Sequence, residues 1–233
     1  MTQSKNPIAR MGPAIQTFSK SKQNMMENDT KEKIGLLVTM KAKPGKEQDV
    51  RDFLLGGLPL VNQEPGTESW YAFQIDESTF GIFDTFSEEK GRQAHLTGEV
   101  AKALLANAGN LLVDFDVNVS IQPIDLLATK LSKGEEHKGL LVIMKAKKGK
   151  AADVERFLLA GKKLVNDEPK TLSWYAIQIN TDTFAIFDTF AENTGRDAHL
   201  NGKVAAALMK NAPEILEGFE ARAIQAIDIL ASK

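Results

Sequence analysis

The chain has 233 residues, 42% of them apolar and 26% charged, and its formal net charge is −2. These are the values of an ordinary globular protein, and the small net charge argues against nucleic acid or an anionic membrane surface as a partner. The absence of cysteine excludes disulfides, thiolate nucleophiles and thiolate metal sites, and no apolar run approaches the roughly 18 residues of a membrane span.

Residues 1–32 differ from the rest of the chain in composition. They contain Pro7 and Pro13 and carry no acidic residue before Glu27. They also lack the continuous apolar core of a secretory signal. We therefore predict an N-terminal tail that belongs to no folded unit, and we expect a soluble, cytoplasmic protein.

The first folded segment has an alternation of strand and helix patterns. Leu36–Ala42 is a short apolar run that Lys43-Pro44-Gly45 ends, which predicts a strand followed by a turn. Apolar residues then recur at helical spacing, two apolar β-rich runs flank a short polar connection, and a second helical pattern precedes a last alternating run. The predicted elements after the first strand are a helix at 46–62, strands at 69–75 and 79–86, a helix at 88–106 and a strand at 117–126.

The same order occurs a second time, at a constant offset of 104 residues through most of the repeat. The motif Trp70-Tyr71-Ala72 returns as Trp174-Tyr175-Ala176, and Ala94-His95-Leu96 returns as Ala198-His199-Leu200. Such self-similarity indicates two copies of one structural unit. We place the first domain at residues 33–131 and the second at 137–233, with a short charged linker between them.

Each repeat reads β-α-β-β-α-β, the order of a ferredoxin-like unit. Two helices cover only one face of a four-stranded sheet, yet both faces carry apolar side chains, as Phe80 and Ile82 point one way and Phe83 the other. The uncovered face needs a partner. We predict an α+β protein in which two tandem ferredoxin-like repeats pack sheet to sheet as an internal pseudo-dimer; a further homo-oligomer stays open.

Three motifs of this pattern resemble the antibiotic biosynthesis monooxygenases of the dimeric α+β barrel superfamily, which include quinol monooxygenases. They are Lys-Pro-Gly-Lys-Glu at 43–47, Glu-Pro-Gly-Thr at 64–67 and Ala-His-Leu at 94–96. The resemblance implies a monooxygenase that uses dioxygen on a quinol or polyphenolic aromatic substrate without a cofactor or metal. It also covers haem-degrading relatives, but the Asn of their first strand and the Trp of their second helix are missing here.

The predicted catalytic residue is His95, because an imidazole with a pKa near 6.5 suits proton transfer. Arg92 and Gly98 lie one turn before and after it on the same helix face. Arg92 would stabilise developing negative charge, and Gly98 would let a group approach the backbone beside the imidazole. In the second copy the same residues are His199, Arg196 and Gly202. The alternative is a structural histidine bonded to a neighbouring strand.

Two further residue types complete the predicted site. Trp70 shares its strand face with Ala72 and Gln74, so it could line a substrate cavity or only pack in the core. Asp84 interrupts an apolar strand face and therefore needs a partner, which is either Arg92 in an ion pair or His95. The second-copy equivalents are Trp174 and Asp188.

Two functional classes follow from these residues. The first is the cofactor-independent monooxygenase, with a small aromatic substrate and dioxygen as partners. The second is a non-catalytic protein that binds a small molecule or supports assembly on the same scaffold. Haem binding or degradation is the least favoured.

Overall fold

The computed structural model of the chain describes residues 31–233. All but the last two residues of the predicted tail, 1–32, lie outside the described residues. Glu32 is only 3% exposed, and its Oε1 accepts hydrogen bonds from Ser69 Oγ at 2.5 Å and Thr85 Oγ1 at 2.7 Å.

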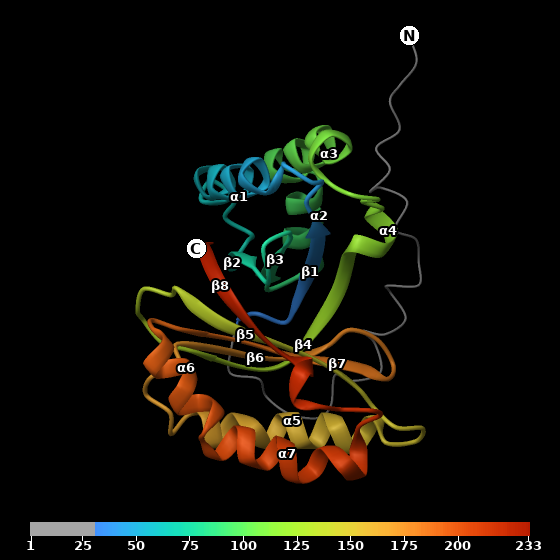
Figure 1. Cartoon of the computed structure of the whole chain (residues 1–233), viewed down its shortest axis with the longest axis vertical. Coiled ribbons are helices and arrows are strands. Elements are labelled where there is room, and N and C mark those ends of the chain that lie inside the picture. The colour runs from blue at the N-terminus through green and yellow to red at the C-terminus, as the bar shows by residue number, and fades with distance from the viewer. Residues whose placement is uncertain (1–30) are drawn as a thin grey trace.

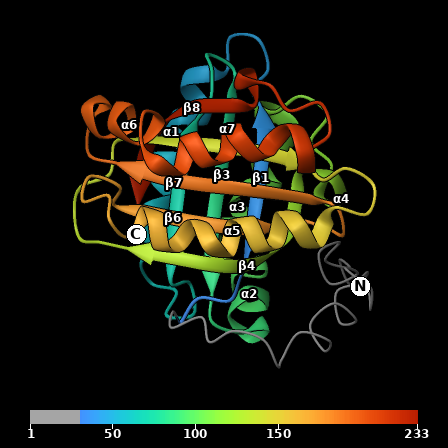
Figure 2. The same cartoon turned by 90° about the horizontal axis from the view of Figure 1, so that it is seen from below.

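The two repeats form one closed eight-stranded barrel with helices on two opposite outer sides (Figures 1 and 2). The first half contains the elements β1 (Ile34–Lys41), α1 (Glu47–Val61), β2 (Ser69–Gln74), β3 (Thr79–Phe86), α2 (Glu89–Leu96), α3 (Glu99–Leu111), α4 (Val117–Ser120) and β4 (Ile121–Leu131). The second half contains β5 (Lys138–Lys145), α5 (Ala151–Val165), β6 (Ser173–Gln178), β7 (Thr183–Phe190), α6 (Asn193–Leu200), α7 (Lys203–Ile215), η3 (Ala221–Ala223) and β8 (Ile224–Ser232).

The strand order, β1-β3-β2-β8-β5-β7-β6-β4, confirms the predicted α+β class and the tandem ferredoxin-like repeats. Each half contributes the four-strand order expected of its fold, and all pairings are antiparallel. The halves also share backbone hydrogen bonds, because β4 pairs with β6 and β8 pairs with β2. The pseudo-dimer is thus a continuous sheet that closes on itself and leaves no unpaired edge.

Three apolar clusters fill the layers. Two lie between the helices and the outer face of each half, and the third fills the barrel interior. Within the barrel, Phe83 and Phe187 stack with ring centroids 4.5 Å apart. Phe73 lies against Gly81, and the equivalent pair in the second half is Ile177 and Ala185. A larger residue on one strand is thus matched by a smaller one on its neighbour.

The helix predicted over residues 88–106 is two helices, α2 and α3. The break falls at Thr97 and Gly98, and the backbone of Gly98 is extended (φ −76°, ψ −179°) where α3 begins. The second half breaks in the same way at Asn201 and Gly202. Periodicity alone missed the break because both helices present apolar side chains to the same sheet.

The last strand of each half begins later than predicted. Val117–Ser120 forms the short helix α4, whose first turn is capped because Asp116 accepts a hydrogen bond from the Asn118 N–H at 2.8 Å. Val119 is 67% exposed, so its alternation with polar neighbours does not reflect a half-buried strand. In the second half the turn η3 replaces the start of the predicted strand.

Candidate functional site

His95 lies on α2 between two carboxylates. Its Nδ1 lies 2.6 Å from Glu64 Oε2, at the end of the turn after α1, and its Nε2 lies 3.2 Å from Asp84 Oδ2 on β3. The Thr67 hydroxyl donates to Glu64 Oε2 at 2.8 Å. The imidazole is 7% exposed and Asp84 is 1% exposed, whereas Glu64 is 18% exposed. The imidazole and Asp84 are therefore buried, and Glu64 is the group of the site that is most exposed to solvent.

The charge state of this group follows from its contacts. A neutral imidazole has one N–H, so it donates to both carboxylates only when it is protonated. Burial opposes that charge, but the carboxylates of Asp84 and Glu64 outweigh it and raise the pKa of His95 to about 10. Burial also opposes ionisation of Glu64, yet the hydrogen bond and charge of His95 lower its pKa. At neutral pH the pair is an imidazolium and a carboxylate.

Asp84 pairs with His95 and not with Arg92, so the second of the two alternatives for this aspartate is correct. Arg92 donates to Glu89 one turn earlier and to the Gly35 carbonyl at 3.4 Å. Through the hydrogen bond to Gly35, Arg92 links α2 to β1. The structure thus brings His95, Asp84 and Gly98 together and leaves Arg92 outside their contacts.

The absence of a side chain at Gly98 leaves room for the carboxylate of Glu64. A Cβ at this position would lie 2.7 Å from Glu64 Oε1, closer than such atoms approach. The group that approaches the backbone beside the imidazole is therefore a side chain of the protein itself. Glu64 and Thr67 were not among the predicted site residues, although both recur at the repeat offset as Glu168 and Thr171 and could have been found from that signal.

The second half repeats this arrangement. His199 Nδ1 lies 2.6 Å from Glu168 Oε2, and His199 Nε2 lies 3.3 Å from Asp188 Oδ2. Burial raises the pKa of Asp188 to about 7, and the carboxylates raise the pKa of His199 despite its burial. A Cβ at Gly202 would lie 2.8 Å from Glu168 Oε1. Arg196 donates to Asn193 and to the Ile227 carbonyl, so it also lies outside these contacts.

An open pocket of about 370 Å³ lies beside the second histidine. Its walls include Glu168, Thr171, His199 and Gly202, so the imidazole and its exposed carboxylate border this space. The pocket is rimmed by residues of the turn after α5 and by the start of α7. Leu164 belongs to this wall and also to that of a neighbouring pocket.

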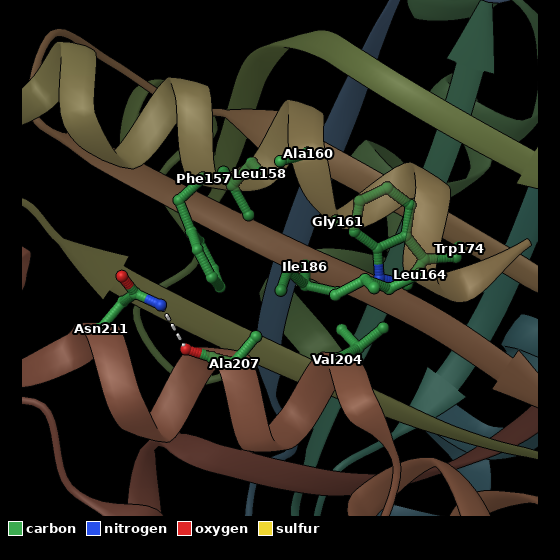
Figure 3. Close-up of a pocket in the computed structure, with 10 residues that line it drawn as sticks. All are labelled: Phe157, Leu158, Ala160, Gly161, Leu164, Trp174, Ile186, Val204, Ala207 and Asn211. Carbon is green, nitrogen blue, oxygen red and sulfur yellow. Dashed lines mark hydrogen bonds between the residues drawn. The ribbon is translucent and has the colours of Figure 1, made fainter.

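That neighbouring pocket is apolar and has a volume of about 200 Å³. Figure 3 shows α5 on one side and α7 on the other, with Ile186 and Trp174 of the sheet between them. Trp174 is fully buried, and its Nε1 has no hydrogen-bond partner among residues 31–233. A buried donor without a partner is costly, and here it belongs to the wall of a pocket. Trp70 takes the equivalent place in the first half, where its ring packs against Gly57.

The barrel interior holds a second polar cluster. The Tyr71 hydroxyl donates to Ser173 Oγ at 3.1 Å, and the Tyr175 hydroxyl donates to Ser69 Oγ at 3.1 Å. Burial raises the pKa of both tyrosines well above the ordinary value. These residues form hydrogen bonds between the two halves, since each tyrosine donates to a serine of the other half.

Two structural findings bear on cofactors and membranes. Within residues 31–233, no group of three or more His, Asp or Glu side chains is arranged to hold a metal ion. None of the helices in the same part of the chain is long and apolar enough to cross a bilayer.

The sequence matches no family model and no curated protein. Solved structures with a similar fold include a putative monooxygenase from Fusobacterium nucleatum, 13% identical, with a TM-score of 0.73 over 87% of this chain and 94% of its own. A putative monooxygenase from Lactobacillus acidophilus is 9% identical, with a TM-score of 0.72 over 86% and 95%. An anthrone oxidase-like protein is 10% identical, with a TM-score of 0.60 over 89% and 95%.

These neighbours and the closed barrel define the chain as a tandem α+β barrel protein, in which one polypeptide supplies both ferredoxin-like halves. Its fold is that of these monooxygenase-like proteins, which agrees with the fold that the motif resemblance implied.

Proposed function

We propose that the protein is a cofactor-independent monooxygenase that oxidises a single-ring quinol in the pocket beside Trp174. The observation that carries this proposal is the apolar pocket of about 200 Å³ whose wall includes the indole of Trp174. A cavity of about 150 Å³ is known to hold benzene, so this volume suits one aromatic ring better than a polycycle or a porphyrin.

The ionised site beside this pocket would supply the electrostatics. A quinol reacts with dioxygen most readily as its anion, and an imidazolium such as His199 stabilises negative charge that develops nearby. The raised pKa favours this role over that of a general base, because Asp188 and Glu168 stabilise the protonated form of the ring despite its burial. Glu168, which contacts the open pocket, would receive or relay the proton of the substrate.

The proposed reaction converts one quinol and one dioxygen into one hydroxyquinone and one water. The quinol anion transfers an electron to dioxygen, and the two radicals combine to form a C–O bond. The resulting hydroperoxide loses water as its O–O bond breaks and a carbonyl forms. All electrons come from the substrate, so no further reductant is needed.

The test is oxygen consumption with hydroquinone and its alkyl derivatives. We expect one dioxygen consumed per quinol, with no oxygen returned when catalase is added, since the product is water. Simple autoxidation would release hydrogen peroxide, and catalase would return half of the oxygen. Trp174→Phe should weaken binding, and the double variant His95→Asn, His199→Asn should reduce turnover by a factor on the order of 10².

A non-catalytic binding protein is the second candidate, and the same pocket supports it. Saturable binding of hydroquinone without oxygen consumption above the rate of the double variant would favour that candidate and overturn the oxygenase.

A further inference from the structure

The two halves provide an internal comparison of the pocket beside the histidine. Of the eleven residues that line it in the second half, most are identical at the equivalent first-half positions. The exceptions are three rim positions, where Asp167, Lys170 and Lys203 take the places of Gln63, Gly66 and Glu99. The chemistry of the wall is retained, and the charge of the rim has changed.

The change makes the second rim more positive. Lys170 adds a positive charge, and Lys203 replaces a negative charge with a positive one; Asp167 adds one negative charge. Both lysines are exposed, and neither ammonium group makes an ion pair or hydrogen bond within residues 31–233. In the first half, by contrast, Glu99 pairs with Lys102 at 2.6 Å. The residue equivalent to Lys102 is Ala206, so Lys203 has no acidic side chain three residues further along the helix to pair with.

The two acidic groups that contact His199 are already paired, and Asp167 is the acidic group that the rim itself retains. Glu168 is held by His199 Nδ1 at 2.6 Å and by the Thr171 hydroxyl at 2.9 Å, and Asp188 lies against His199 Nε2. Lys203 is the first residue of α7, where the helix dipole also favours a negative group over a positive one. A lysine there is unfavourable for the helix, which is consistent with a role toward a ligand.

We propose that the second-half site selects an aromatic ligand that carries a carboxylate, and that the first half lacks this preference because Gly66 and Glu99 stand where Lys170 and Lys203 do. The ring would occupy the apolar pocket at Trp174, and the carboxylate would extend past Leu164 to Lys170 and Lys203. The two halves would then be specialised sites and not two equal copies. This inference rests on the proposed function for the place of the ring, but it concerns binding and does not depend on oxidation.

Each half contains one tryptophan, so one sample reports on both halves. The experiment follows the two indole N–H signals of the ¹⁵N-labelled full chain while benzoate or benzyl alcohol is added; neither probe is a quinol. We expect benzoate to shift the Trp174 signal with a dissociation constant about tenfold lower than that for Trp70, and to lose this preference in high salt. Benzyl alcohol should bind the two halves alike.

A reciprocal exchange provides the matched control. Lys203→Glu should remove most of the preference for benzoate at Trp174 and leave benzyl alcohol unchanged, and Lys170→Gln should act in the same direction. Glu99→Lys should increase benzoate affinity at Trp70. Equal benzoate affinity in both halves, a Lys203→Glu effect that is the same for both probes, or no saturable shift with either probe would overturn the inference. Failure of hydroquinone to drive oxygen consumption would overturn the oxygenase alone.

Discussion

The hydroxyl oxygens of Tyr71 and Tyr175 lie 3.3 Å apart in the barrel interior, so equivalent residues of the two halves meet at the centre of the molecule. Each hydroxyl also bonds a serine of the opposite half, Ser173 or Ser69. Because the surrounding interior is apolar and tightly filled, these bonds are shielded from water.

We expect Tyr71→Phe to lower the free energy of unfolding by about 0.5–1.5 kcal/mol, since it removes the hydrogen bonds to Ser173 and Tyr175. Tyr175→Phe should do the same. The double variant should cost less than the sum of the two, because each single substitution already removes the hydrogen bond between the two hydroxyls. Urea denaturation of the four proteins measures this coupling, and strict additivity would show that the two hydroxyls act independently.

A half of the chain should not persist as a monomer. In the full chain, β4 pairs with β6 and β8 pairs with β2, so a fragment of residues 31–131 has two unpaired strand edges and an uncovered apolar face. Since equivalent strands exist in each half, two fragments can rebuild the barrel. We expect a dimer or an aggregate in sedimentation measurements; a stable monomeric fragment would contradict the internal pseudo-dimer.

Much of this fold could be predicted from the repeat, because every element occurs twice and the apolar faces of the strands require a partner. The exceptions have local physical causes. The break between α2 and α3 falls at Thr97 and Gly98, and Gly98 lies beside the carboxylate of Glu64, a contact from a distant segment that an apolar pattern cannot show. The start of β4 was misplaced because Val117 and Val119 alternate with polar residues in a segment that Asp116 turns into a helix.

The candidate site was predictable only in part. His95 and Asp84 were recognised because a titratable group on an apolar face needs a partner. Glu64 was overlooked because it follows a helix and precedes a proline, where an acidic residue is usually read as part of a turn. Arg92 was included on helical spacing, which places it on the same face but cannot show that it bonds Glu89 and the Gly35 carbonyl.

The stability of the fold should decrease as the pH rises from about 6.5 to about 10. The pKa of His95 is raised to about 10 in the folded protein from an ordinary value of 6.5, so its stabilising effect is complete below 6.5 and is lost by about 10. Burial raises the pKa of Asp84 and acts in the same direction. The lowered pKa of Glu64 acts oppositely, and its contribution is lost only as the pH falls below its ordinary value of 4.5.

Urea midpoints at pH 6 and pH 9 test this dependence. We expect the wild type to be clearly less stable at pH 9 and the double variant His95→Asn, His199→Asn to show a much smaller difference between the two pH values. An equal pH dependence in both proteins would mean that other groups carry it. The histidine ring signals give a second measurement, since those that disappear in His95→Asn should titrate well above pH 7.

Gly98, which precedes α3, and Gly109, which lies within it, should respond oppositely to alanine. Gly109 lies in the exposed part of the helix with nothing within 4 Å of an added Cβ, so Gly109→Ala should stabilise the protein by about 0.5–1 kcal/mol through the higher helix propensity of alanine.

At Gly98 the added Cβ would lie 2.7 Å from Glu64 Oε1, and we expect Gly98→Ala to cost about 1–3 kcal/mol because the carboxylate must move away from His95. Gly98 has φ −76°, so backbone strain does not contribute and the contacts of the added Cβ decide the result. Most of the cost should disappear when Glu64→Ala is made first, since the carboxylate is then absent and only the carbonyls of His95 and Ala94, at 3.1 and 3.2 Å, stay close. Thermal and urea denaturation of the four single and double variants separate these effects, and a Gly98→Ala cost that is unchanged without Glu64 would place its cause elsewhere in the turn.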